Sequence, residues 1–251
     1  MNTATTAREP LPRGFWVIWS TVALDMIGFG IVAPILGRYA DRFGASGFQV
    51  GLLFASFSLA QMIFSPILGR WSDRVGRKPV IIISLFGTAI GSFITGAAGA
   101  LWVLFAGRLI DGASGASVSV AQSAITDLAT KEQRARMLGL LGMAFGVGFV
   151  FGPAIGGLAA LGGPHIPFYV AGMLALINAV AAIIRLQETR VPNKAAQTTR
   201  VHVPFHKRQY GALAGVGFFS MLAFSGFEAT FSLFGGERFN LTEASTAVVF
   251  L

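Results

Sequence analysis

The sequence predicts an all-α membrane protein, a multi-pass bundle of transmembrane helices. Of its 251 residues, 54% are hydrophobic and 12% are charged, whereas soluble proteins carry about 25% charged residues. The apolar residues gather in runs of about 20, the length of helix that crosses the hydrocarbon core of a bilayer. The 32 glycines suit helices that pack closely in lipid, where small residues let backbones approach. These observations exclude the soluble, globular class of protein.

Seven apolar runs predict seven transmembrane helices. The first run follows a polar start and is too long for a cleaved signal peptide, so we expect it to remain as a helix. An eighth run begins near Glu243 and is still too short to cross a bilayer at Leu251, so we expect the chain to be a fragment of a longer protein. The seven runs are residues 14–39, 47–68, 79–98, 101–128, 137–161, 166–185 and 210–234.

The distribution of basic residues predicts the orientation of the helices. Fifteen of the 19 Lys and Arg residues lie before the first helix or in the loops after the second, fourth and sixth helices. Arg38, Arg42 and Arg238 lie on the opposite side, and Arg108 lies within a helix. Basic residues accumulate on the cytoplasmic side of membrane proteins. We therefore expect a cytoplasmic N-terminus in the cytoplasmic (inner) cell membrane, and we interpret the net charge as a topology signal rather than as a nucleic-acid surface.

A polar segment, residues 187–209, separates the sixth helix from the seventh and contains Pro192 and Pro204. It predicts a cytoplasmic linker. The linker divides the chain into a six-helix part, residues 1–186, and the start of a second part, residues 210–251.

The loop after the second helix concentrates charge and glycine. Residues 69–80 read G-R-W-S-D-R-V-G-R-K-P-V, and the two glycines allow a tight reversal and a close approach of helices. A loop that only anchors the topology needs positive charge alone, yet an aspartate lies among the bases. A topology anchor alone therefore does not account for the residues that we select in this loop: Gly69, Asp73, Arg74, Gly76, Arg77 and Lys78.

Four ionisable residues lie within the predicted helices: Asp25, Arg108, Asp111 and Glu228. Charged groups inside a bilayer are energetically unfavourable and therefore mark candidate functional sites. At a rise of about 1.5 Å per residue, the first three all lie near the bilayer midplane. Asp111 and Glu228 either line a cavity or have capping and packing roles.

Asp25 and Arg108 allow two interpretations. They form either a buried ion pair that only fixes helix packing or a switch that depends on protonation. In the switch, desolvation favours the neutral carboxylic acid and a nearby guanidinium favours the carboxylate. Small changes in hydration or in distance would then load or release a proton.

The fifth predicted helix carries glycines at regular spacing. Gly148, Gly152 and Gly156 recur every four residues and form a smooth groove for a neighbouring helix. A proline in the same stretch removes one backbone hydrogen bond and bends the helix. The pattern predicts a packing seam made by Gly139, Gly148, Gly152, Pro153, Gly156 and Gly157.

These stretches resemble motifs of the major facilitator superfamily of transporters. Residues 69–80 are similar to its signature loop, although the family usually has Leu where this chain has Trp71. Residues 104–116, L-x-x-x-R-x-x-D-G-x-S-G-A, resemble its helix-four motif, which usually has Gln in place of Asp111. The glycine spacing resembles a helix-five motif found chiefly in the antiporter branch. Asp25 resembles the acidic position in helix one of drug–proton antiporters such as the tetracycline exporters.

The resemblance implies a whole protein of twelve helices in two halves that rock about a central cavity. It implies export of a small organic compound, such as a drug, in exchange for protons. Arg108 would take part in proton coupling together with Asp25 and Asp111. Three further residues would pair with the signature loop to close the cytoplasmic side: Asp127, Arg134 and Arg136.

Two alternatives remain open at this point: proton-coupled uptake by the same fold, and a non-transporting membrane scaffold or receptor. The glycine pattern favours export over uptake, and buried charges are not needed in a scaffold.

We expect no enzymatic activity, since no nucleophile–base pair or metal cluster is apparent and the chain has no cysteine. The proton gradient would supply the energy without a cofactor or metal. The expected partners are a small-molecule substrate and the lipid bilayer, with no nucleic acid, and the full-length protein would be a monomer. We do not expect the 251 residues to transport by themselves.

Overall fold

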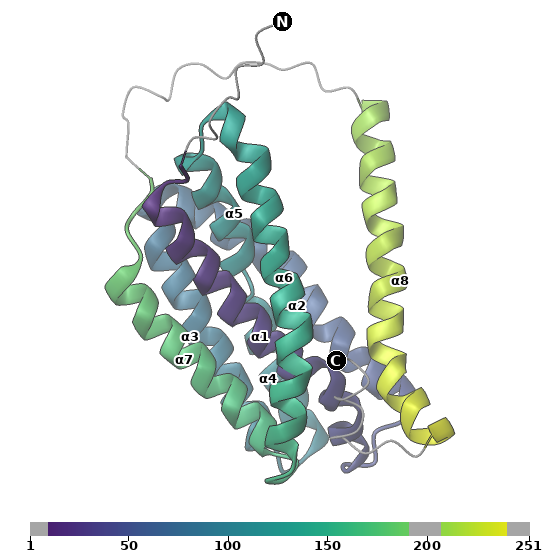
Figure 1. Cartoon of the computed structure of the whole chain (residues 1–251). Helices are drawn as coiled ribbons and strands as arrows, with labels where there is room; N and C mark the ends of the chain where they lie inside the picture. Colours follow the sequence, from purple (N-terminus) through teal and green to yellow (C-terminus); the bar gives the residue numbers. More distant parts are fainter. Residues whose placement is uncertain (1–9, 191–206, 240–251) are drawn as a thin grey trace, which may run out of the picture.

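The computed structural model describes residues 10–190 and 207–239, and nearly all of these residues are helical (Figure 1). Within them, seven helices form a bundle, and α8 lies alongside in contact with α1 and α2. No strand occurs in this part of the chain, so the predicted all-α architecture is confirmed. The helices are α1 (Arg13–Asp41), α2 (Gly47–Val75), α3 (Arg77–Gly96), α4 (Leu101–Ser114), α5 (Ser117–Leu128), α6 (Lys131–Ala160), α7 (Ile166–Arg185) and α8 (Lys207–Phe239).

Membrane-crossing length and composition occur in five of the described helices: α1, α2, α3, α6 and α7. α8 contains a shorter apolar stretch, Ala214–Phe227. The predicted eighth run near Glu243 and most of the predicted linker lie outside the described residues.

The prediction of one continuous helix over residues 101–128 is wrong, because the structure divides this run into α4 and α5. The backbone leaves helical geometry at Gly115, where ψ is 35°, and α5 begins two residues later at Ser117. The break releases backbone carbonyl groups from the helix. The side-chain amide of Gln61 on α2 donates to the Gly115 carbonyl at 2.8 Å. A side chain from another helix thus satisfies a backbone group that would otherwise lack its partner.

The charged segment after α2 is also a much shorter loop than its composition predicts. α2 continues to Val75 and α3 begins at Arg77, so the junction is the single residue Gly76. Gly76 has φ 109° and ψ 161°, a backbone conformation that strains any residue with a Cβ. Charged residues beyond the apolar run continue both helices, because a helix outside the membrane needs no apolar side chains.

α6 likewise begins before the predicted apolar run. The Thr130 hydroxyl accepts a hydrogen bond from the backbone N–H of Gln133 at 3.3 Å, which is a favourable N-cap. Arg134 and Arg136, which we predicted in a loop, therefore lie in the first turns of α6.

Two clusters of buried apolar side chains hold the bundle together, one near each end. The first includes Phe15, Val80 and Met137, and the second includes Tyr39 and Phe168. α1 contributes to both clusters and packs along α6 and α7. The middle of α1, between the two clusters, is free to present a polar side chain.

The predicted glycine seam brings the backbone of α6 onto α1. A Cβ added to Gly148 would lie 2.6 Å from the Met26 carbonyl oxygen, and one added to Gly152 would lie 2.5 Å from the Gly30 Cα. Gly139 takes no part, because a Cβ there would meet nothing within 4 Å. The other members of the pattern are buried along α6: Pro153, Gly156 and Gly157.

We expect Gly152→Ala to destabilise the bundle, because its Cβ would force the backbones of α1 and α6 apart. Overpacking of a closed interface costs about 1–3 kcal/mol, so the Tm measured by thermal unfolding in detergent should fall. The matched control is Gly146→Ala on the same helix, where an added Cβ meets nothing within 4 Å. This control should be neutral or stabilising by about 0.4–1 kcal/mol. Equal Tm values for the two variants would contradict the packing argument.

Candidate functional site

A cavity of about 900 Å³ lies in the middle of the bundle, and α8 contributes to its wall. Aromatic side chains form much of its apolar lining. The ring of Phe29 lies 5.9 Å from that of Phe57 and 6.4 Å from that of Phe149, and Phe149 lies 5.2 Å from Phe224 on α8. Apolar walls with a few polar groups are typical of sites for small organic molecules.

The cavity brings together three of the four ionisable residues that we expected within the membrane, Asp25, Arg108 and Asp111. Arg108 Nη1 donates to Asp111 Oδ2 at 2.8 Å, one turn along the same helix. The Arg108 guanidinium also lies 4.1 Å from the centroid of the Phe57 ring, which is a cation–π arrangement. We expected Arg108 to lie beside Asp25 and to adjust its protonation. The ion pair that the structure describes instead joins Arg108 to Asp111.

Ser117 Oγ donates a hydrogen bond to Asp25 Oδ2. We did not predict this partner of Asp25 from the sequence. Ser117 is buried and is the first residue of α5, directly after the break at Gly115. The only sequence signal for this contact was the S-G-A stretch at 114–116, which we read as part of a continuous helix.

Glu228 lies on α8, but its side chain is outside the described part of the structure. Met221 and Phe224, which precede it on the same helix, line the cavity. A cavity role for Glu228 therefore stays a prediction.

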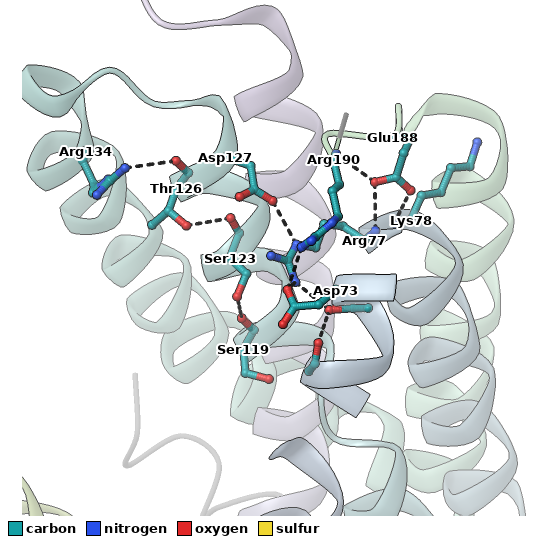
Figure 2. A network of polar contacts seen from close by, with 12 residues as sticks. Asp73, Arg77, Lys78, Ser119, Ser123, Thr126, Asp127, Arg134, Glu188 and Arg190 are labelled. Carbon is teal, nitrogen blue, oxygen red and sulfur yellow. Dashed lines mark hydrogen bonds and ion pairs between the residues drawn. The ribbon is translucent and has the colours of Figure 1, made fainter. Parts of the chain in front are cut away.

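A network of charged side chains lies at the end of the bundle that holds the start of α1 (Figure 2). Arg77 is its centre and is only 6% exposed. Arg77 Nε donates to Asp127 Oδ2 at 2.9 Å, and Nη1 lies 2.8 Å from Asp73 Oδ1. Nη1 also donates to Ser72 Oγ at 2.7 Å. The structure thus places Asp127 in contact with Arg77, a residue of the signature loop.

Two members of this ion network come from the segment after α7, which we did not select from the sequence. Glu188 Oε1 accepts the backbone N–H of Arg77 at 2.8 Å, and Oε2 accepts that of Lys78 at 3.1 Å. Arg190 Nη1 donates to Asp73 Oδ1 at 2.9 Å. The ion network is therefore composed of Asp73, Arg77, Lys78, Asp127, Glu188 and Arg190.

Other residues predicted to act in gating lie at the edge of this network. Arg134 donates to the Thr126 carbonyl at 3.4 Å (Figure 2), so it contacts the last turn of α5. Arg74 and Arg136 are exposed. The close approach that we expected at Gly69 is wrong, because this residue lies within α2 and an added Cβ would meet nothing within 4 Å.

The pKa of Glu188 is lowered from its ordinary value by the backbone that surrounds it. Partial burial raises this pKa, but hydrogen bonds from the backbone N–H groups of Arg190, Arg77 and Lys78 outweigh burial. The N-terminus of α3 further favours a negative charge at this position. The fold therefore stabilises the charged form of Glu188.

We expect Glu188→Gln to lower the Tm at neutral pH and to matter less as the pH falls. A lowered folded-state pKa contributes stability that is fully present above the unfolded-state value of about 4.3 and is lost as the pH falls through the folded-state value. Thermal unfolding in detergent, at neutral pH and in steps below the ordinary Glu value, measures this difference. Glu132→Gln is the matched control, since Glu132 is exposed in the first turn of α6. A difference between wild type and Glu188→Gln that stays constant on acidification would contradict the assignment.

Known relatives cover most of this chain. A family model described as Major Facilitator Superfamily matches residues 18–251. Tetracycline resistance protein, class C, of Escherichia coli is 35% identical over 233 residues, which are 89% of this chain and 59% of that protein. Multidrug resistance protein 1 of Bacillus subtilis is 31% identical over 238 residues, which are 93% of this chain and 61% of that protein. The chain thus spans about 60% of the length of these two relatives.

Solved structures share the fold. The human organic anion transporter MFSD10 (TETRAN) matches with a TM-score of 0.76 at 22% identity, over 96% of this chain and 69% of that chain. A bacterial homolog of the human lysosomal transporter Spinster, inward-facing and unoccupied, matches with a TM-score of 0.78 at 18% identity, over 94% of this chain and 57% of that chain. At these identities the likeness concerns the fold alone. Because the family model matches nearly the whole chain, the chain belongs to the Major Facilitator Superfamily, a family of membrane transporters.

Proposed function

We propose that this chain is the N-terminal part of a proton-coupled antiporter that exports small organic compounds from the cytoplasm by alternating access. The observation that carries the proposal is the placement of Asp25, Arg108 and Asp111 in one largely apolar cavity in the middle of the bundle. Ionisable groups within the membrane mark ion and substrate pathways, and transporters of this kind bind near the bilayer midplane. The tetracycline and multidrug resistance relatives support export of drugs.

Asp25 is the proposed proton carrier. Its partner Ser117 is a hydroxyl, which donates to a carboxylate and accepts from a carboxylic acid, so this contact suits both protonation states. Arg108 and Asp111 neutralise each other as a buried pair. Asp25 is then the charge in the cavity that a proton or a cationic substrate would compensate. The charges of the Arg108–Asp111 pair would also adjust the proton affinity of Asp25.

The lining of the cavity favours a lipophilic substrate with a flat ring system. Phe29, Phe57 and Phe149 offer ring faces and edges to such a compound, and Asp25 would attract a positive charge on it. Substrate and proton would then compete for Asp25, which is the requirement for exchange.

The ion network would close the cytoplasmic side between export steps. Exposed ion pairs contribute only about 0–1 kcal/mol each, but Arg77 is buried and has two carboxylate partners. In this proposal the network and the N-terminus face the cytoplasm, the protein lies in the cytoplasmic membrane as a monomer, and the proton gradient supplies the energy without a cofactor.

We expect Asp25→Asn to abolish drug-evoked proton release. The complete gene is expressed, everted membrane vesicles are energised to hold a pH gradient, and tetracycline-like drugs and lipophilic cations are added. The wild type should release protons on addition of a substrate. The side-chain amide of the variant cannot bind and release a proton, so no release is expected. Asp41→Asn is the matched control, since Asp41 lies on the same helix outside the cavity lining and this variant should retain release.

Proton release that persists in Asp25→Asn would remove Asp25 from the proton path and leave Asp111 as the remaining described acid in the cavity. The absence of release with every compound in the wild type would contradict export. Uptake assays with sugars and organic acids would then test symport by the same fold.

A further inference from the structure

The contacts between α3 and the chain that follows α7 are reciprocal. Glu188 accepts the backbone N–H groups of Arg77 and Lys78, the first two residues of α3. In return, Lys78 Nζ donates to the carbonyl oxygen of Ile183 in the last turn of α7 at 2.8 Å. An acid thus lies at the N-terminus of one helix and a base at the C-terminus of the other. Both helix dipoles favour this arrangement.

The position of Glu188 is set by its surroundings. Leu186 leaves α7 in an extended conformation, and its side chain is buried in the apolar cluster at this end of the bundle. Gly76 leaves the space that the carboxylate occupies, because a Cβ at Gly76 would lie 2.7 Å from Glu188 Cδ. The glycine of the signature loop therefore makes room for Glu188 as well as allowing the tight junction between α2 and α3.

Arg77 is consequently held through both its backbone and its side chain. Glu188 binds its backbone N–H, while Asp73 and Asp127 bind its guanidinium. Asp73 Oδ1 is in turn shared between Arg77 and Arg190 (Figure 2). Acids and bases balance within the ion network, so loss of either residue after α7 leaves an uncompensated charge beside a buried arginine.

We propose that Glu188 and Arg190 are positioning residues of the cytoplasmic gate. Glu188 orients Arg77 through the N-terminus of α3, and Arg190 holds Asp73 against Arg77. Residues 188–190, which follow α7, therefore belong to the gate, and a displacement of Arg190 would act directly on Asp73. This inference rests on the proposed function, in which the ion network closes the cytoplasmic side.

The test measures access to the cavity and does not require transport. The complete gene carries Gln122→Cys, at an exposed position that lines the cavity on α5, and the 251 residues contain no other cysteine. A membrane-impermeant maleimide labels this cysteine from the cytoplasmic face of everted vesicles. Glu188→Gln and Arg190→Gln should each raise the labelling rate on the order of 2- to 5-fold, since loss of a charge at a helix N-terminus or of a partly exposed ion pair shifts a two-state equilibrium by about this factor.

Two further variants separate charge from folding. Glu188→Asp keeps the charge near the N-terminus of α3 and should restore most of the wild-type labelling rate. Glu132→Gln makes the same chemical change outside the network and should label at the wild-type rate. Arg190 is partly exposed, with 39% of its side chain accessible, so Arg190→Gln tests the inference even where Glu188→Gln lowers expression.

Arg77→Ala distinguishes failure of this inference from failure of the gate itself. Faster labelling in Arg77→Ala with wild-type rates in both Glu188→Gln and Arg190→Gln would overturn the assignment of these two residues and leave the gate intact. Wild-type rates in all three variants would overturn the gate and this inference together. Drug-evoked proton release by the protein with its native Asp25 decides the antiport proposal separately.

Discussion

The direct contact between the backbones of α1 and α6 is the interaction on which the remaining structure depends. Gly148 on α6 meets the Cβ and the carbonyl group of Met26 on α1, and Gly152 meets the backbone of Gly30. Asp25 precedes Met26, so this contact sets the depth and direction of its carboxylate in the cavity. In lipid the hydrophobic effect does not drive helices together, and close packing of small residues takes its place. The position of Asp25, the proposed proton carrier, therefore depends on a seam of glycines.

α5 connects the cavity with the ion network over only 12 residues. Its first residue, Ser117, donates to Asp25, and its penultimate residue, Asp127, accepts from Arg77. The break at Gly115 separates this short helix from α4, which carries the Arg108–Asp111 pair. A change of charge on Asp25 would act on the start of α5, while the other end of α5 holds the centre of the proposed gate. The proposed proton site and the proposed gate thus contact opposite ends of one short helix.

The fold was largely predictable from the sequence, because apolar runs long enough to cross a bilayer leave few arrangements other than a helical bundle. Composition also located most helix ends, but it misplaced those at which a helix extends past its apolar run into charged residues. The starts of α3 at Arg77 and of α6 at Lys131 are examples. It missed the break at Gly115, because the side chain that compensates it, Gln61, lies 54 residues away in the sequence.

For the candidate site, the sequence alone determined which residues are unusual: Asp25, Arg108 and Asp111 stand out because charge within an apolar run is energetically unfavourable. It also determined that the signature loop and the glycine pattern resemble those of a transporter family. Only the tertiary structure decided the partners. Ser117 reaches Asp25 across 92 residues, and Glu188 and Arg190 reach α3 and α2 across 111 and 117 residues. Local periodicity carries no information over such separations, and these contacts exist only because packing brings the ends of distant helices together.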